Sequence, residues 1–384
     1  MATLMSVEQL SHLMTPVALL DYKRLKANID RMAEIARNNN VNLRPHVKTH
    51  KCVQIGKMQI HKGAKGITVS TLREAEVFAA SGFNDITYAV PISRNKIAMA
   101  LELAQRVSLK IIVDNPHTVD ILDASSKEAR THLDVLVKVD CGLHRCGVDP
   151  TSNTAVNLVR KIDEASNLNF VGILTHAGHS YNAKSIDEIK RIAQQEQDVM
   201  ARFSKMLKRE GLAPQTVSVG STPTIVLADS FNEEITEVRP GNYVFYDYTQ
   251  VALGTCKVSD CALTVLASVV GTYPDRIVID AGATALSKDQ GPRQISPNCG
   301  YGQVMADYEE GLLARSATID SITQEHARIS VPEDSSIHYK INDVIRILPN
   351  HSCLAANLFD EYVVLEGERI KARWRTRCIQ RLTT

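Results

Sequence analysis

Two lysines in one basic segment are the first candidates for covalent chemistry. Lys48 and Lys51 belong to residues 44–51, whose sequence is Arg-Pro-His-Val-Lys-Thr-His-Lys. A lysine can form a Schiff base with an aldehyde when a semi-enclosed site and neighbouring cations lower its pKa, and the arginine and histidines of this segment are such neighbours. A solvated basic turn has the same composition. The local sequence therefore leaves open whether either lysine reacts, and which one.

Two turns farther along the chain could bind a phosphate group. Each follows a strand-like run, and backbone N–H groups and hydroxyls in such turns favour an anion. In a (β/α) barrel the last two strand-to-helix loops are the usual phosphate site, although either turn alone could simply serve the backbone geometry. The first turn lies within residues 217–224, and the second lies within residues 239–243 and ends at Tyr243.

His351 and Cys353 could bind one metal ion together. In an extended segment, residues i and i+2 point to the same side, and an imidazole with a thiolate favours zinc. Two ligands make an incomplete site, so a buried cysteine beside an ordinary histidine is the alternative. A further group, His176, His179 and Tyr181, follows an apolar strand-like run, a position where histidines are often functional.

The elements that must position these residues alternate regularly from residue 17 to about residue 220. Short β-branched runs precede longer amphipathic stretches, and this alternation predicts parallel strands joined by crossover helices. Roughly seven or more such units favour a closed α/β fold, a (β/α)8 TIM-like barrel, with an open doubly wound sheet as the alternative. We expect strands at residues 17–20, 67–70, 86–90, 110–113, 135–139 and 171–174, and helices at residues 23–37, 72–80, 96–106, 118–130, 154–165 and 186–209.

After about residue 250 the pattern changes to strands separated by Gly, Pro, Asn and Asp, with hardly any helix between them. This composition predicts a β-rich second domain. We expect a barrel over residues 15–250 and a C-terminal β-rich domain over residues 251–384, which residues 1–14 can join. Strands are expected there at residues 262–270, 276–280, 316–321, 327–331 and 344–348.

The composition narrows the class of protein. The 384 residues carry a formal net charge of +1 without a long basic run, so nucleic acid is not an expected partner. The first 14 residues lack the features of a signal peptide, and no apolar run approaches the roughly 20 residues of a membrane helix. Eight scattered cysteines are typical of free thiols in a reducing compartment. We therefore expect a cytoplasmic protein without a membrane partner.

The order of these segments resembles the zinc-dependent D-serine dehydratase family. The likeness runs from residue 15 to residue 364 and includes the lysine segment, residues 66–71, residues 175–181, both phosphate turns and residues 349–353. This family belongs to the fold type III pyridoxal-phosphate (PLP) enzymes, with D-threonine aldolase and alanine racemase. The resemblance implies an alanine-racemase-like barrel, a β-rich carboxy-terminal domain and a homodimer with composite active sites.

The resemblance also assigns roles to residues. It makes Lys48, and not Lys51, the lysine that carries PLP as a Schiff base and acts in catalysis. It places Tyr181 near the cofactor ring and makes His351 and Cys353 the Zn²⁺ ligands. Five other residues match positions of the phosphate loops, namely Gly220, Ser221, Thr222, Gly241 and Asn242.

The implied reaction is dehydration of a D-3-hydroxy amino acid, in which Lys48 removes the α-proton and zinc helps the β-hydroxyl leave. D-serine, which would give pyruvate and ammonia, is the expected substrate, with D-threo-3-hydroxyaspartate as an alternative. D-threonine aldolases usually have aspartate at the position of Cys353, so retro-aldol cleavage is the second reaction to consider. Racemisation has no use for a metal at the β-carbon. A non-catalytic PLP carrier needs neither the metal pair nor the β-rich domain.

Overall fold

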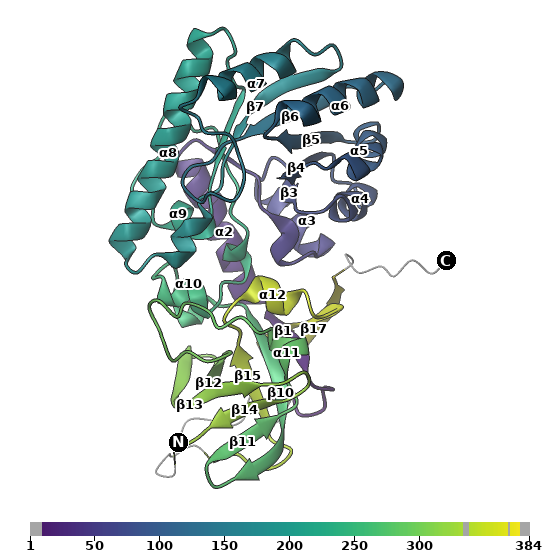
Figure 1. The fold of residues 1–384 in the computed structure, drawn as a ribbon. Coiled ribbons are helices and arrows are strands. Elements are labelled where there is room, and N and C mark those ends of the chain that lie inside the picture. The colour runs from purple at the N-terminus through teal and green to yellow at the C-terminus, as the bar shows by residue number, and fades with distance from the viewer. Residues whose placement is uncertain (1–9, 333–337, 368, 377–384) are drawn as a thin grey trace. The chain divides into compact units, whose positions relative to one another are not determined.

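The computed structural model describes residues 10–332, 338–367 and 369–376, which form two compact units (Figure 1). The barrel unit comprises residues 31–48 and 53–241. The β unit comprises the described residues up to residue 30, residues 49–52, and the described residues from 242 onward. The units are thus interleaved in the sequence, whereas the amino-acid pattern predicts a continuous barrel over residues 15–250 and a β-rich domain over residues 251–384, which residues 1–14 can join.

The barrel unit contains eight parallel strands in the order β2-β9-β8-β7-β6-β5-β4-β3. A parallel bridge between His46 and Thr68 joins the two edges of this sheet, which confirms a closed (β/α) barrel and excludes the open doubly wound sheet. The strands are β2 (Asn42–Leu43), β3 (Ile67–Val69), β4 (Asp85–Pro91), β5 (Ser108–Val113), β6 (Leu133–Lys138), β7 (Leu168–Leu174), β8 (Thr216–Val219) and β9 (Glu237–Val238).

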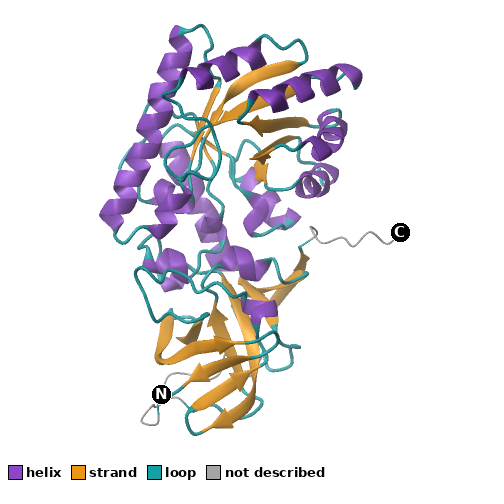
Figure 2. Cartoon of the chain, viewed as in Figure 1, coloured by secondary structure: helices purple, strands orange, loops and turns teal. Residues whose placement is uncertain are grey.

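Helices lie around the parallel strands of the barrel unit (Figure 2). Their starts follow local chemistry: Thr71, Asn115 and Ser185 each accept a hydrogen bond from the third residue of the helix that follows, which satisfies an otherwise unpaired N–H group. The helices are α2 (Tyr22–Asn38, which begins in the β unit), α3 (Val53–His61), α4 (Leu72–Ala80), α5 (Ile97–Ala104), α6 (Pro116–Glu128), α7 (Asn153–Asp163), α8 (Ile186–Arg209) and α9 (Thr222–Val226). Among the described residues, no helix is both long and apolar enough to cross a membrane.

The strand expected at residues 17–20 forms, but it does not belong to the barrel. It is β1 (Val17–Asp21), which pairs antiparallel with β10 (Leu263–Tyr273) and parallel with β16 (Glu361–Glu366) in the β unit. A strand buried on both faces has the same apolar pattern in either sheet, so the sequence cannot identify its partner. The first barrel strand is β2, and its two residues are too few to show a periodicity.

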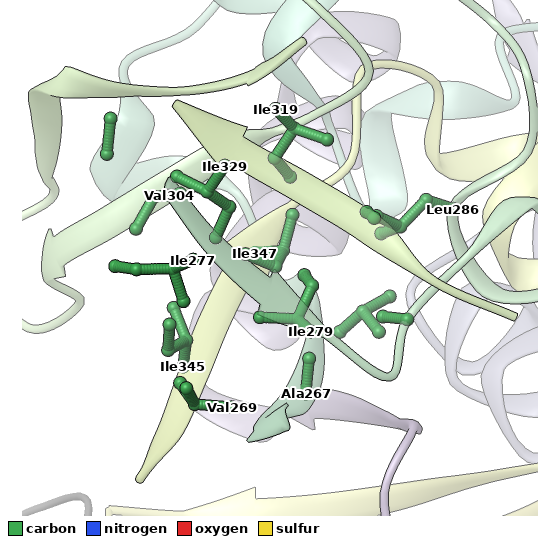
Figure 3. Close-up of a cluster of buried hydrophobic side chains, with 14 of the residues drawn as sticks. Ala267, Val269, Ile277, Ile279, Leu286, Val304, Ile319, Ile329, Ile345 and Ile347 are labelled. Atoms are coloured by element: carbon green, nitrogen blue, oxygen red, sulfur yellow. The ribbon is translucent and has the colours of Figure 1, made fainter. Parts of the chain in front are cut away.

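The β unit is a nine-stranded sheet in the order β11-β14-β13-β12-β15-β10-β1-β16-β17, in which β11 also pairs with β10 and closes a barrel. Its apolar core includes Ile279, Ile319 and Ile347 (Figure 3). The strands are β1, β10 (Leu263–Tyr273), β11 (Arg276–Ile279), β12 (Gln303–Asp307), β13 (Leu312–Ile322), β14 (Ala327–Ser330), β15 (Val344–Leu348), β16 (Glu361–Glu366) and β17 (Arg369–Arg375), with the short helices α10 (Tyr248–Ala252), α11 (Ala283–Leu286) and α12 (Ser352–Ala356).

Candidate active site

Lys48 lies just beyond the carboxyl end of β2, where barrel enzymes place reactive groups. The segment that carries it is a 3-10 helix, η1 (Val47–Thr49). Lys48 is exposed, and its backbone N–H donates to His46 Nδ1 at 3.4 Å. Lys51, in the β unit, differs because its amine donates to Asn357 Oδ1. The two lysines of the basic segment therefore have different surroundings.

His176 follows β7 and lies beside the turn after β8. Its Nδ1 is 3.0 Å from the carbonyl oxygen of Gly220. Burial lowers the pKa of His176 to about 3, and the positive charges of Lys48, Lys138 and Arg145 act in the same direction. The imidazole is thus neutral at pH 7, and it lies close enough to these three cations to be affected by their charge.

His179 and Tyr181 lie in the 3-10 helix η3 (Gly178–Asn182), which follows β7. The hydroxyl of Ser180, in the same helix, is 2.9 Å from the hydroxyl of Ser221. This contact joins the β7 loop to the first predicted phosphate turn. The structure therefore brings the segment of Tyr181 and the segment of Ser221 together at the same end of the barrel.

The first phosphate turn is held by a buried carboxylate that the sequence does not reveal. Glu196 Oε1, on α8, accepts hydrogen bonds from the backbone N–H groups of Ala177 and Gly220, both at 3.0 Å, and Oε2 accepts from the Thr224 hydroxyl at 3.1 Å. Gly220 has a φ of +119°, and Ser221 caps α9. The N–H of Gly220 is thus already used, and an anion at this turn would need other donors. An acidic residue on the apolar face of α8 is the only feature of the sequence that could have drawn attention to Glu196.

The second phosphate turn crosses from one unit to the other. Gly241 ends the barrel unit, whereas Asn242 and Tyr243 belong to the β unit. The Asn242 amide donates to Asp247 Oδ2 at 2.6 Å and to the Ser352 hydroxyl at 3.0 Å. Tyr243 is fully buried. The side chain of Asn242 therefore contacts the segment that carries the predicted metal ligands.

Buried cations lie at the carboxyl ends of β6 and β9. Burial lowers the pKa of Lys138 to about 8, and the charge of Arg239 lowers it further. Burial also lowers the pKa of Arg239 to about 10, and its guanidinium donates to the Ser218 hydroxyl and the Thr175 carbonyl. With Lys48, these groups favour an anionic ligand at this end of the barrel.

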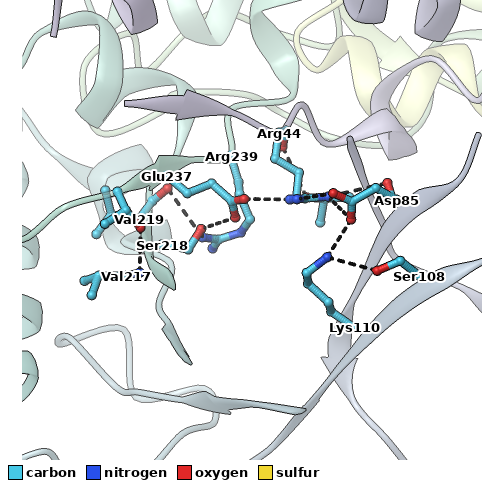
Figure 4. Close-up of polar contacts among 11 residues, drawn as sticks. Arg44, Asp85, Ser108, Lys110, Val217, Ser218, Val219, Glu237 and Arg239 are labelled. Atoms are coloured by element: carbon cyan, nitrogen blue, oxygen red, sulfur yellow. Dashed lines mark hydrogen bonds and ion pairs between the residues drawn. The ribbon is translucent and has the colours of Figure 1, made fainter. Parts of the chain in front are cut away.

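Arg44 has a different role from the one that its sequence position suggests. The sequence predicts that its charge lowers the pKa of the neighbouring lysines, but Arg44 is buried and ion-paired with Glu237 at 2.6 Å and with Asp85 at 2.7 Å. Lys110 pairs with Asp85 in turn, at 2.6 Å, and Figure 4 shows the resulting chain of charges. Because the two carboxylates neutralise its charge, Arg44 stabilises the interior of the barrel and has little effect on the lysines.

The predicted metal ligands lie at the start of a helix and not in an extended segment. His351, whose own backbone is extended, occupies the N-cap position of α12 without a side-chain capping bond, and Cys353 lies in the first turn of the helix. The i, i+2 argument is therefore wrong, but the two side chains still interact: burial opposes protonation of His351, yet hydrogen bonds to Asp289 and Cys353 raise its pKa well above the ordinary value. The His351 Nδ1 is 3.3 Å from Asp289 Oδ2, so the other ring nitrogen is the one that a metal could bind together with Cys353.

The second predicted ligand has polar neighbours of its own. Cys353 Sγ is 3.2 Å from the hydroxyl of Thr49, the residue after Lys48 in the chain, and 3.7 Å from the amide nitrogen of Asn242. The described residues contain no cluster of three or more His, Cys, Asp or Glu side chains that could hold a metal. An imidazole oriented by a carboxylate and a hydrogen-bonded sulfur are nonetheless a pair of donors that could hold a metal ion.

Known protein families match the chain in two successive segments. The model of the alanine racemase N-terminal domain matches residues 20–249, and the putative serine dehydratase domain matches residues 262–365. D-serine dehydratase of Dictyostelium discoideum is 37% identical, over 94% of this chain and 95% of the relative. D-threonine aldolase of an Arthrobacter species is 29% identical, over 96% and 93%.

A solved structure extends the likeness to three dimensions. D-threo-3-hydroxyaspartate dehydratase from Delftia sp. HT23 has a TM-score of 0.90 and 34% identity, over 96% of this chain and 98% of that one. A mutant of D-threo-3-hydroxyaspartate dehydratase in a metal-free form has the same TM-score. Because lyases match both units, the alternative of a cofactor carrier is set aside. The chain belongs to the D-serine dehydratase family of fold type III enzymes, and it is a lyase that acts on a D-hydroxy amino acid.

Proposed function

We propose that the chain is a PLP- and zinc-dependent dehydratase that converts D-serine into pyruvate and ammonia. The observation that carries the proposal is the interaction of His351 with Cys353, with Asp289 on the imidazole and Thr49 on the sulfur. A thiolate favours zinc over the harder magnesium or manganese that a carboxylate accepts. The 37% identity to a D-serine dehydratase supports the substrate.

The proposed cofactor residues suit an anionic aldehyde. Lys48 presents an exposed amine, and Lys138 and Arg239 supply positive charge at the same end of the barrel. Since Glu196 occupies the N–H of Gly220, we assign the phosphate to the hydroxyl side of the turn. The complete proposed cofactor set is Lys48, Tyr181, Gly220, Ser221, Thr222, Gly241, Asn242 and Tyr243.

In the proposed reaction Lys48 is the residue that would hold the cofactor, and its Nζ would be the base that takes the α-proton of the substrate. When bound, PLP withdraws electrons from the α-carbon, and zinc on His351 and Cys353 acts as a Lewis acid towards the β-hydroxyl. The α-proton and the β-hydroxyl leave together as water. A water molecule then replaces the amino group, which leaves as ammonia, so the net products are pyruvate and ammonia.

The test is to incubate the purified full chain, loaded with PLP and zinc, with D-serine and to measure pyruvate and ammonia in equal amounts. L-serine is the control for stereochemistry. Lys48→Ala should abolish both the product and the visible absorbance of the lysine-bound cofactor, whereas Lys51→Ala should retain the absorbance. Absence of pyruvate from D-serine in the loaded wild type would refute the proposal.

D-threo-3-hydroxyaspartate is the second candidate substrate, because an enzyme named for it shares 34% identity and the same fold. Its dehydration would give oxaloacetate and ammonia. The same incubation with D-threonine distinguishes a dehydratase, which forms 2-oxobutanoate, from an aldolase, which forms glycine and acetaldehyde. We expect the 2-oxo acid because of Cys353.

A further inference from the structure

The segment that carries the predicted metal ligands is held by the start of helix α10. Asp247 precedes this helix, and its Oδ2 accepts hydrogen bonds from the backbone N–H of Ser352 at 2.8 Å and from the Ser352 hydroxyl at 3.1 Å. Ser352 stands between His351 and Cys353. One carboxylate oxygen thus holds the backbone between the two ligands.

The first two residues of α10 bind the backbone that precedes His351. The backbone N–H of Tyr248 donates to the carbonyl of Pro349, and that of Thr249 donates to the carbonyl of Asn350, both at 3.2 Å. The hydroxyl of Thr249 donates to the same Asn350 carbonyl at 2.7 Å. The backbone is therefore fixed immediately before His351 and immediately after it.

Asp247 is also bonded to its own helix and to a predicted cofactor residue. Its Oδ1 accepts from the N–H of Gln250 at 3.0 Å, and its Oδ2 accepts from the amide of Asn242 at 2.6 Å. The residue is only 1% exposed. A buried carboxylate that accepts four hydrogen bonds has little freedom to move, since each lost bond leaves a buried donor unpaired.

We propose that Asp247 is a positioning residue for the metal ligands: through Ser352 it fixes the separation and orientation of His351 and Cys353 before the metal binds. This inference rests on the proposed metal site. Zinc affinity depends on ligands held in the required geometry by a supporting shell, and Asp247 touches the backbone between the ligands without being a ligand itself. It differs in this respect from Asp289, which contacts the imidazole directly.

The test is a zinc titration of the full chain by competition with a chelator, for the wild type, Asp247→Asn and Asp343→Asn. The amide of Asp247→Asn keeps the size of the side chain but turns an N–H group towards a donor. We expect its dissociation constant for Zn²⁺ to rise about 10-fold to 100-fold. Asp343→Asn is the matched control, because Asp343 accepts a backbone bond from Lys340 in the same unit, and it should bind Zn²⁺ like the wild type.

Co²⁺ in place of Zn²⁺ gives a second reading, because the thiolate-to-cobalt absorbance reports whether Cys353 is a ligand. We expect this absorbance to weaken in Asp247→Asn. A merely structural role would instead lower the melting temperature of the metal-free protein while the Zn²⁺ affinity and the cobalt spectrum stayed unchanged, and that result overturns the proposal. If Asp247→Asn does not fold, Ser352→Ala, which removes the hydroxyl bond to Asp247 Oδ2, should weaken Zn²⁺ binding severalfold, and unchanged binding there also overturns the proposal.

His351→Ala in the same titration separates this inference from the proposed function. If His351→Ala loses the Zn²⁺ that Asp247→Asn retains, the metal site stands and the positioning role is wrong. If His351→Ala binds Zn²⁺ as tightly as the wild type, the metal site itself is wrong, and the inference falls with it.

Discussion

The imidazole Nδ1 of His351 lies 3.3 Å from the Oδ2 of Asp289. Asp289 is itself fixed, because its Oδ1 accepts a 2.6 Å hydrogen bond from the N–H of Gly291. The bond to His351 is the main reason that the pKa of Asp289 lies below its ordinary value. A carboxylate on one ring nitrogen orients the imidazole and makes the other nitrogen a better metal ligand.

We therefore expect Asp289→Ala to weaken zinc binding about 10-fold to 100-fold, measured by chelator competition. Asp320→Ala is the control, because Asp320 is a carboxylate of the same unit that pairs with the exposed Arg328, and it should leave the affinity unchanged. Equal affinity of Asp289→Ala and the wild type would show that the carboxylate does not support the metal.

Glu196 should be essential for the shape of the first phosphate turn. In Glu196→Ala the buried N–H groups of Ala177 and Gly220 lose their acceptor, and we expect the free energy of unfolding to fall by at least about 1–3 kcal/mol, with weaker PLP binding. Glu196→Gln keeps one oxygen as acceptor and should retain most of both properties. Denaturant unfolding and PLP titration measure the two effects.

The control for Glu196→Ala is Glu188→Ala on the same helix. Glu188 is half-buried and its side chain accepts a bond from the N–H of Lys184, away from the phosphate turn, so its loss should lower the free energy of unfolding by no more than about 1 kcal/mol. If both alanine variants lost the same free energy of unfolding, the hydrogen bonds of Glu196 to the turn would not contribute more to stability than an ordinary bond of this helix.

His176 should make stability depend on pH. Its folded pKa, about 3, lies below its ordinary value of 6.5 because burial disfavours the charged ring. Above pH 6.5 the ring is neutral in both states and costs nothing. As the pH falls below 6.5 the unfolded chain binds a proton that the folded protein does not, so stability is lost, by at most about 1.4 kcal/mol per pH unit.

His176→Gln cannot bind this proton. The free energy of unfolding of the variant should therefore fall less than that of the wild type as the pH falls from 6.5 towards 4.5. Urea unfolding of both proteins at each pH measures this difference. Parallel curves for the two proteins over this range would mean that the folded protein protonates His176 as readily as the unfolded chain does.

The buried ion pair of Arg44 should contribute more to stability than an exposed pair does. Arg44→Met leaves the carboxylate of Glu237, whose side chain is 6% exposed, without its cation, and removal of one partner of a buried pair costs about 3–5 kcal/mol. Arg328→Met breaks an exposed pair with Asp320 and should cost no more than about 1 kcal/mol. Thermal or denaturant unfolding measures how much stability each variant loses. Similar losses in Arg44→Met and Arg328→Met would contradict the prediction.

The sequence determined the class of fold and many of its elements. Helices α4 and α8 and strand β15 have the bounds that the pattern predicts, because one apolar face or one apolar run repeats at a fixed local spacing. The order of the lysine segment, the phosphate turns and the pair His351 and Cys353 was enough to recognise the family, since that order is a property of the chain alone.

The tertiary structure decided which residues are partners. It placed β1 in the β unit, turned residues 351–353 into the start of a helix, and paired Arg44 with Glu237. It also brought Glu196 to the Gly220 turn and Asp247 to Ser352, which are 105 residues apart. The spacing of apolar residues along the sequence indicates only which face of a helix or strand is buried. The partner of a buried charge comes from a distant part of the chain, and only the folded packing brings the two together.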